Sequence, residues 1–197
     1  AIHSDLGKRS AIKTLRAHYA RSPDVRKRFL REGQAASKIR HPHIVDVYDV
    51  AIQDKMPFLV MEYLEGEVLA SVIARDKPLG VQRTADLLIP VIAAVAAAHD
   101  LGILHRDLKP ENVFLSKDRG GVVQPKVLDF GISKILNAQE EHSLTGTSNL
   151  IGTPYYMSPE QARSEKQIDA RSDQYSFGVI LYECVTGERP FEGPTLY

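Results

Sequence analysis

The hydrophobic pattern of the chain changes its period near residue 65, and this change constrains the fold more than any other feature of the sequence. Before it, short runs with alternating apolar residues are typical of β-strands; they are residues 10–15, 44–52 and 58–63. After it, apolar residues recur at helical spacing in two long runs, 85–99 and 172–185, with a loop-rich stretch at 101–116 between them. A strand-rich first part ahead of a helix-rich second part predicts an α+β fold with two lobes.

One helix is expected within the first part, over residues 22–41. It begins with Ser-Pro-Asp, which is typical of a helix start. Its apolar stripe includes Val25 and Phe29 and also carries Glu32, so one acid lies on an otherwise apolar face. Because a buried carboxylate requires a cation, Lys13 on the neighbouring strand is the expected partner of Glu32. A surface salt bridge is the alternative role for this acid.

Charge and cysteine content exclude several classes of protein. The 25 Lys and Arg residues balance the 25 Asp and Glu residues, so no net field favours nucleic acid or an anionic membrane. The basic cluster at 26–31 is best interpreted as a solvated helix face. Cys184 is the only cysteine, which excludes an intramolecular disulfide and fits a reducing compartment. The apolar run 85–98 is shorter than the roughly 20 residues that span a bilayer, so we expect a buried helix there.

Two stretches of the sequence carry most of its chemical information. Residues 105–112 read His-Arg-Asp-Leu-Lys-Pro-Glu-Asn and residues 129–131 read Asp-Phe-Gly, whereas the loop patterns G-x-x-x-x-G-K-[ST] and G-x-G-x-x-G have no match. Asp107 is suited to accept a hydroxyl proton. Asn112 and Asp129 offer hard oxygen ligands of the kind that Mg²⁺ selects beside phosphates. Together with a lysine in the first stretch, which would neutralise a transferring phosphoryl group, they supply what phosphoryl transfer needs.

At these stretches the sequence resembles the eukaryotic-type protein kinase family, whose H-R-D-L-K-P-E-N and D-F-G motifs are intact. Residues 11–13, Ala-Ile-Lys, resemble the V-A-I-K strand of the family, and residues 158–160, Ser-Pro-Glu, resemble A-P-E. Within the family, Lys109 and Thr153 favour Ser/Thr over Tyr specificity, and residues 159–163 are similar to those of bacterial members. The resemblance implies a two-lobed, protein-kinase-like fold, truncated at both ends because neither the glycine-rich loop nor the last helices have a match.

The resemblance also implies a division of the chain and a set of ligands. Residues 1–64 would form a partial N-lobe of strands plus helix C, residues 62–66 the hinge, and residues 65–197 a partial, mainly helical C-lobe. ATP and Mg²⁺ would be the cofactors, with Mn²⁺ as an alternative ion. The implied catalytic residues are Lys13, Glu32, Asp107 and Lys109. The implied ATP-binding residues are Ala11, Lys13, Met61, Glu62, Leu64, Asn112, Phe114 and Asp129, of which Asn112 and Asp129 would hold the metal. Plain core packing is the alternative for the apolar members, Phe114 above all.

The segment from Asp129 to Glu160 resembles an activation segment and is rich in hydroxyl groups. Thr147 is the first expected phosphorylation site and Thr145 the second, with Arg106 as the partner of the phosphate. A loop without a regulatory role is the alternative. Thr153 is expected to contact the substrate. Structural roles are expected for His105, Phe130, Glu160 and Asp173.

The sequence therefore favours a Ser/Thr protein kinase that autophosphorylates its activation loop. Its partner would be a protein with a Ser or Thr hydroxyl, with no nucleic acid and no membrane contact within these residues, and a kinase-domain dimer stays open. The expected location is the cytoplasm, with a membrane tether outside these residues left open. The alternative is a pseudokinase or docking module that binds nucleotide or partners without turnover. A small-molecule phosphotransferase is disfavoured because residues 152–156, Gly-Thr-Pro-Tyr-Tyr, resemble a polypeptide-binding segment.

Overall fold

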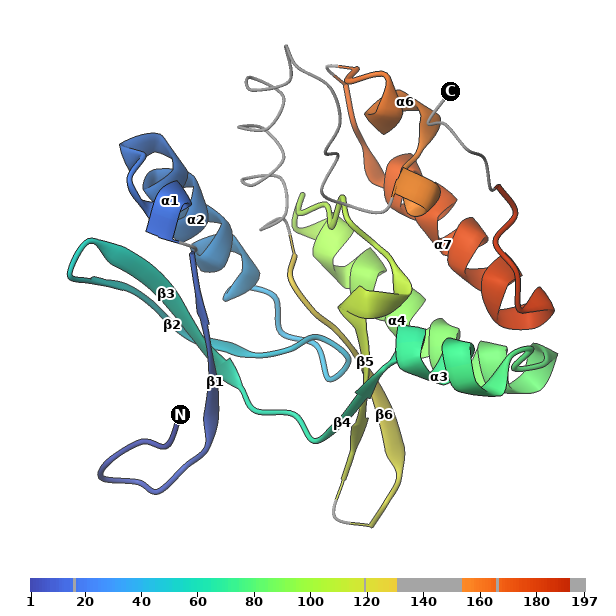
Figure 1. The fold of residues 1–197 in the computed structure, drawn as a ribbon, viewed down its shortest axis with the longest axis horizontal. Helices are drawn as coiled ribbons and strands as arrows, with labels where there is room; N and C mark the ends of the chain where they lie inside the picture. Colours follow the sequence, from blue (N-terminus) through green and yellow to red (C-terminus); the bar gives the residue numbers. More distant parts are fainter. Residues whose placement is uncertain (16, 119, 131–153, 166, 192–197) are drawn as a thin grey trace.

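The computed structural model describes residues 1–15, 17–118, 120–130, 154–165 and 167–191 (Figure 1). Its first part is an antiparallel three-stranded sheet with the strand order β1-β3-β2. The strands are β1 (Ser10–Thr14), β2 (Val47–Gln53) and β3 (Met56–Glu62). Two helices, α1 (Ala17–Ala20) and α2 (Pro23–Ala36), pack against this sheet.

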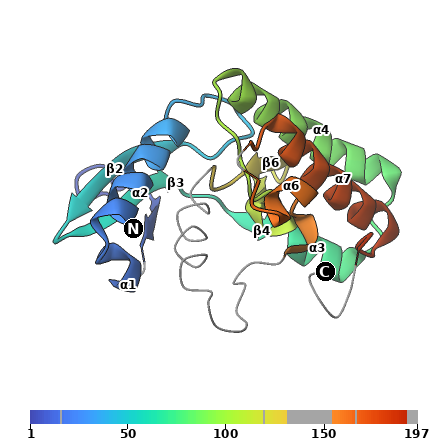
Figure 2. The same cartoon turned by 90° about the horizontal axis from the view of Figure 1, so that it is seen from above.

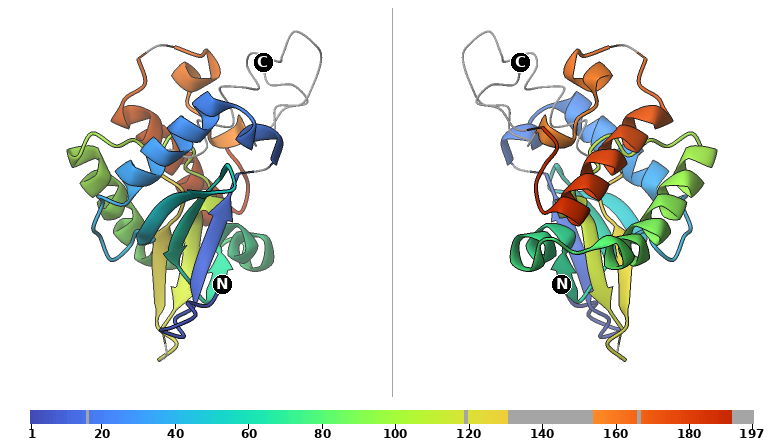
Figure 3. Two further views of the ribbon diagram at one scale, coloured as in Figure 1. Left: turned by 90° about the vertical axis from the view of Figure 1, so that its left-hand side faces the viewer. Right: turned by 90° about the vertical axis from the view of Figure 1, so that its right-hand side faces the viewer.

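The second part combines another antiparallel sheet with most of the helices. The strands, in the order β4-β5-β6, are β4 (Gly66–Val68), β5 (Val113–Lys117) and β6 (Val123–Val127). The helices are α3 (Leu69–Asp76), α4 (Val81–Asp100), α6 (Pro159–Ala162) and α7 (Ala170–Thr186), with short 3-10 turns at Pro110–Asn112 and Pro154–Tyr156. Figure 2 shows the first sheet with α1 and α2 toward one end of the molecule and α3, α4 and α7 toward the other, and Figure 3 shows the molecule from each of these two sides. The predicted α+β class is confirmed.

Helix α2 packs unusually close to the first sheet at Gly33. A Cβ atom at this position would lie 2.5 Å from Cδ2 of Leu59 and 3.0 Å from Cγ2 of Val50. The buried residues of the helix include Val25 and Phe29, which lie on the stripe predicted from the sequence. Glycine therefore allows the helix backbone to approach β2 and β3, and this approach sets the height of α2 above the sheet.

The two sheets are joined through β6. Val45 N donates to Val127 O at 3.0 Å, and Val127 N donates to His43 O at 2.8 Å. Beside these bonds, Lys126 Nζ forms an ion pair with Glu62 Oε2 at 2.7 Å, and the Lys126 side chain is only 9% exposed. The segment between α2 and β2 is thus fastened to the strand that leads directly into Asp129.

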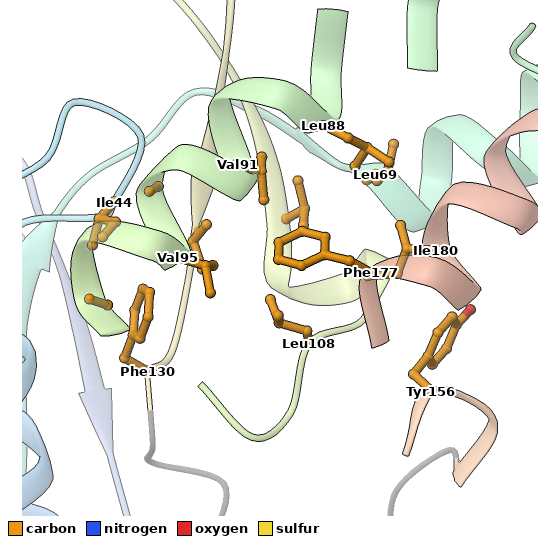
Figure 4. Packing of buried hydrophobic residues seen from close by; sticks show 14 of the residues in the cluster. Ile44, Leu69, Leu88, Val91, Val95, Leu108, Phe130, Tyr156, Phe177 and Ile180 are labelled. Atoms are coloured by element: carbon orange, nitrogen blue, oxygen red, sulfur yellow. The ribbon is translucent and has the colours of Figure 1, made fainter. Parts of the chain in front are cut away.

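The main hydrophobic core lies between α4, α7 and the second sheet (Figure 4). Val91 and Ile180 are fully buried, and Phe177 on α7 and Phe130 after β6 pack into the same cluster. Leu108, from the loop that follows α4, is also buried in it. Because this loop contributes an apolar side chain to the core, its neighbouring polar residues are held in fixed places.

Two predictions about the elements are wrong. The helix expected over 22–41 ends at Ala36, because the backbone then closes tighter turns in which Ile39 N donates to Ala36 O at 3.1 Å and the Ile39 side chain enters the core. The loop-rich stretch 101–116 contains the start of β5. This strand has five residues, and its partners β4 and β6 come from distant parts of the sequence, so local periodicity does not reveal it.

Helix α4 is the one helix in the described residues that is long and apolar enough to cross a membrane by length and composition. Seven of its residues are buried. They face the second sheet and α7, with which the helix makes its contacts. This burial is that of a core helix, as the sequence predicts.

Candidate active site

A buried carboxylate on α7 holds the loop that follows α4. Asp173 accepts hydrogen bonds from the backbone N–H groups of His105 at 2.8 Å and Arg106 at 2.7 Å. It also lies 2.7 Å from Nε2 of His99 at the end of α4, and its side chain is only 2% exposed. Arg106 has a φ of 67°, which is sparsely populated for a residue with a side chain. Three donors on one carboxylate hold the loop in this conformation.

The His105 ring connects this loop to the end of β6. Nε2 lies 2.7 Å from Leu128 O, and Nδ1 accepts from Asp107 N at 3.3 Å. One ring nitrogen must donate and the other must accept, so the ring is neutral with the proton on Nε2. Burial lowers the pKa of His105, against the opposing effect of the Asp173 carboxylate. The ring of Phe130 packs edge-on against it, with centroids 4.9 Å apart.

The Asp107 carboxylate is contacted by two residues of its own loop. Lys109 Nζ lies 3.0 Å from Asp107 Oδ2. Asn112 Nδ2 donates to the backbone O of Asp107 at 2.7 Å and to its Oδ2 at 3.0 Å. With the amide nitrogen committed to Asp107, Asn112 Oδ1 is the atom that it can offer to a cation.

The predicted ion pair between Lys13 and Glu32 is not formed. Lys13 Nζ instead lies 2.7 Å from Asp129 Oδ2, and Asp129 has a φ of 60°. Glu32 is on the inward side of α2, with a side chain that is 16% exposed, and its ion pair within the described residues is a long one of 3.9 Å to Arg31. The position of Asp129 after β6 brings its carboxylate to Lys13, so the strand lysine and the Asp-Phe-Gly aspartate are partners.

The residues expected around adenine come from both sheets. Ala11 and Met61 are register partners on β1 and β3, and both are partly buried. Phe114 lies on β5, and Leu64 lies in the connection between β3 and β4. Glu62 already uses its backbone N–H, which donates to Asp46 O at 2.9 Å, and its carboxylate, which pairs with Lys126.

Arg106 connects the loop at residues 105–112 to α6. Its backbone O accepts from Gln161 Nε2 at 2.8 Å. Its Nε is the one buried side-chain nitrogen or oxygen without a hydrogen-bond partner in the part of the chain that the structure describes. Glu160, beside Gln161, accepts a short 2.5 Å hydrogen bond from Ser172 Oγ. The predicted sites Thr145, Thr147 and Thr153 lie outside the described residues.

The donor set fits a nucleotide with a divalent ion. Asp129 and Asn112 provide oxygen ligands, and the ammonium groups of Lys13 and Lys109 match phosphate charge. Among the described residues, no group of three or more His, Cys, Asp and Glu side chains is arranged to hold a metal by itself. Phosphate oxygens and water would therefore complete the shell, as is usual for Mg²⁺.

Three contacts near the site were not predicted from the sequence, although a structural role was expected for His99. His99 contacts Asp173, Lys126 pairs with Glu62, and Gln161 contacts Arg106. For Gln161 a signal was present, because Ser158 and Gln161 have the S-x-x-Q spacing of a capping box, and the structure forms that box. For His99 and Lys126 the partners are 74 and 64 residues away, so no local pattern identifies them.

Comparisons with known proteins agree with this geometry. A family model described as a protein kinase domain matches residues 1–196. The chain is 44% identical over 192 residues to the probable serine/threonine-protein kinase PknB of Corynebacterium glutamicum, and the match covers 95% of this chain and 29% of that protein. It is 41% identical over 196 residues to the serine/threonine-protein kinase PknB of Mycobacterium tuberculosis, with 98% and 30% covered. The chain thus spans less than a third of the length of these curated relatives.

A solved structure is similar as well. The PknI kinase domain of Mycobacterium tuberculosis superposes with a TM-score of 0.74 and 27% sequence identity. The match covers 99% of this chain and 71% of that chain. The similarity therefore extends over both sheets and the helices that carry the candidate site.

Proposed function

Because this chain belongs to the protein kinase family, we propose that it transfers the γ-phosphate of ATP to serine and threonine hydroxyls of proteins. The observation that carries the proposal is the pair of short lysine to aspartate contacts, Lys13 with Asp129 and Lys109 with Asp107. They bring two cations and two carboxylates to the ends of the two sheets. Phosphoryl transfer depends on such charges in fixed positions more than on covalent chemistry by the protein.

Each residue of the catalytic loop has a proposed task. Asp107 orients the substrate hydroxyl and accepts its proton, because its carboxylate is held by Asn112 and Lys109. Lys109, already at this carboxylate, neutralises the phosphoryl group in transfer. Asn112 Oδ1 and the Asp129 carboxylate hold the metal. Mg²⁺, when bound, would supply charge neutralisation between the phosphates.

Lys13 is proposed to bind the phosphates of ATP. Its ammonium group contacts Asp129, so it lies next to the carboxylate that we assign to the metal. The adenine ring of ATP would lie between the two sheets, against Ala11 and Met61 on one side and Phe114 on the other. The backbone of Glu62 and Leu64, within the proposed hinge at 62–66, would meet the adenine edge, with Glu62 offering its carbonyl.

We further propose that phosphate on the segment after Asp129 activates the enzyme. Arg106 lies directly before Asp107, and its buried Nε lacks a hydrogen-bond partner among the described residues. A phosphate would supply the missing acceptor and pair with the guanidinium. Thr147 and then Thr145 are the proposed sites, and Thr153 is proposed to contact the substrate. Because the proposed reaction uses ATP, we propose that it takes place in the cytoplasm.

The test is phosphate transfer from ATP by the full-length protein with Mg²⁺ and a general protein substrate, followed by phosphoamino acid analysis. Phosphoserine or phosphothreonine, without phosphotyrosine, supports the proposal. Lys13→Met should lower the transfer by at least about 100-fold, because the lysine that we assign to phosphate is lost. Lys8→Met is the matched control, because Lys8 lies over the Tyr48 ring on the surface, away from the site.

A measurement of nucleotide binding by the parent protein identifies the alternative. Nucleotide binding without phosphate transfer by the parent would refute the kinase proposal and support a pseudokinase. Mass spectrometry of the parent after incubation locates autophosphorylation. Phosphate at Thr145 or Thr147 would support the regulatory role of Arg106, and phosphate that avoids the whole segment 131–153 would contradict it.

A further inference from the structure

The side-chain amide of Gln161 accepts one hydrogen bond and donates another. Its Oε1 accepts from Ser158 N at 3.1 Å, and its Nε2 donates to Arg106 O at 2.8 Å. A backbone N–H only donates and a backbone carbonyl only accepts, so the two partners determine the orientation of the amide. Gln161 N also donates to Ser158 Oγ at 3.4 Å, which completes the capping box of α6.

The contact to Arg106 O falls on a peptide segment that needs support. Arg106 has a φ of 67°, and a residue with a side chain keeps such a conformation only where its surroundings hold it. On its N–H side the support comes from Asp173 at 2.7 Å. On its carbonyl side it comes from Gln161. The carbonyl of Arg106 belongs to the peptide bond that leads into Asp107. Both contacts therefore set the direction in which the Asp107 side chain projects from the loop.

We propose that Gln161 is a positioning residue for Asp107, acting through the Arg106 carbonyl. This inference rests on the proposed function, in which Asp107 meets the substrate hydroxyl. Gln161 is also the first residue after the segment 129–160, so its amide connects the end of that segment to the catalytic loop. A change in the position of α6 would therefore act directly on Arg106, the residue before Asp107.

A purely structural role for Gln161 would consist of the capping box alone, and the chain allows the two roles to be separated. Glutamate serves the capping box as well as glutamine does, because it accepts from the N-cap N–H. Its carboxylate cannot donate, so Gln161→Glu keeps the contact to Ser158 N and loses the contact to Arg106 O. Gln161→Met loses both contacts without adding charge.

The experiment compares these two variants with the parent in the full-length protein. Gln174→Met is the matched control, because Gln174 is an exposed glutamine on α7. Both Gln161 variants should lower kcat about threefold to tenfold, which corresponds to about 0.6–1.4 kcal/mol, and leave the KM for ATP within about twofold. Gln161→Met, which also breaks the capping box, should lower the unfolding temperature further than Gln161→Glu does. A parent-like kcat in Gln161→Glu would overturn the inference.

Hydrogen exchange provides a readout that does not depend on turnover. The backbone amides of Arg106 and Asp107 should exchange faster in both Gln161 variants than in the parent and in Gln174→Met. If the parent transfers no phosphate, the proposed function fails and the exchange rates alone decide the inference. Faster exchange in Gln161→Glu then supports positioning by Gln161, and unchanged exchange overturns it.

Discussion

Replacing Asp173 by Asn removes the carboxylate that three donors share. One oxygen accepts from His99 Nε2 and His105 N, at 2.7 and 2.8 Å, and the other accepts from Arg106 N at 2.7 Å. Asparagine keeps one oxygen and replaces the other by an NH₂ group, which only donates. At least one N–H group of the loop must then face another donor in a site where the side chain is 2% exposed.

The cost of this change can be worked from its parts. A hydrogen bond to a charged group contributes about 1.5–3 kcal/mol, and a buried donor left without an acceptor costs about 1–3 kcal/mol. Taking one lost charged bond and one unpaired donor, we expect Asp173→Asn to lower the free energy of unfolding by about 2.5–6 kcal/mol. At about 2–4 °C per kcal/mol for a chain of this length, the unfolding temperature should fall by about 5–24 °C.

The assay is urea unfolding followed by circular dichroism. Asp169→Asn is the matched control, because Asp169 caps α7 four residues earlier with an exposed side chain, and asparagine caps a helix equally well. The control should unfold like the parent. If Asp173→Asn also unfolds like the parent, the three hydrogen bonds do not hold the loop as we argue, and the assignment of Asp173 as its anchor is refuted.

Three further predictions concern stability and reactivity. Gly33→Ala should lower the free energy of unfolding by up to about 2 kcal/mol, because overpacking of about 1–3 kcal/mol exceeds the roughly 1 kcal/mol gained in helix propensity. Leu59→Val should lower the free energy of unfolding less in the Gly33→Ala variant than in the parent. An equal decrease in both would argue against the contact between residue 33 and Leu59. Burial lowers the pKa of His105, so its contribution to stability is complete above pH 6.5 and falls as the pH is lowered, because the unfolded ring binds the proton first. Urea unfolding between pH 8 and 5 should show this slope weakened in His105→Asn, and an identical slope would contradict it. Burial raises the pKa of the Cys184 thiol to about 12, so iodoacetamide at pH 8 should label it only after unfolding; rapid labelling of the folded protein would show that it is accessible.

The loop at residues 105–112 was the most predictable part of the candidate site, because its proposed chemistry is contained in one short stretch. Asp107, Lys109 and Asn112 are separated by only a few residues, and their contacts are within the loop itself. Their residue types and their order in the sequence are therefore enough to indicate phosphoryl transfer without knowledge of the fold. The anchor of this loop, Asp173, was recognised only through the family resemblance.

The partner of Lys13 could not be predicted from local patterns. The sequence predicts Glu32 on α2 as the partner, whereas the structure pairs Lys13 with Asp129 after β6. Which one reaches Lys13 depends on the height of α2 above the sheet and on the conformation of Asp129, whose φ of 60° no residue-type pattern indicates. The strand β5 was missed for a related reason, since its register is determined by β4 and β6. Tertiary distances, rather than propensities, decide both features.

The measurement that tests the central claim most directly is the initial rate of Mg·ATP-dependent phosphorylation by Asp107→Asn in the full-length protein. Asp54→Asn is the control, since Asp54 lies in the turn between β2 and β3 and asparagine tolerates its φ of 51°. We expect Asp107→Asn to lose at least about 100-fold in rate while it keeps the parent's unfolding temperature and ATP affinity. A rate within about threefold of the parent would contradict the assignment of Asp107 as the residue that accepts the hydroxyl proton.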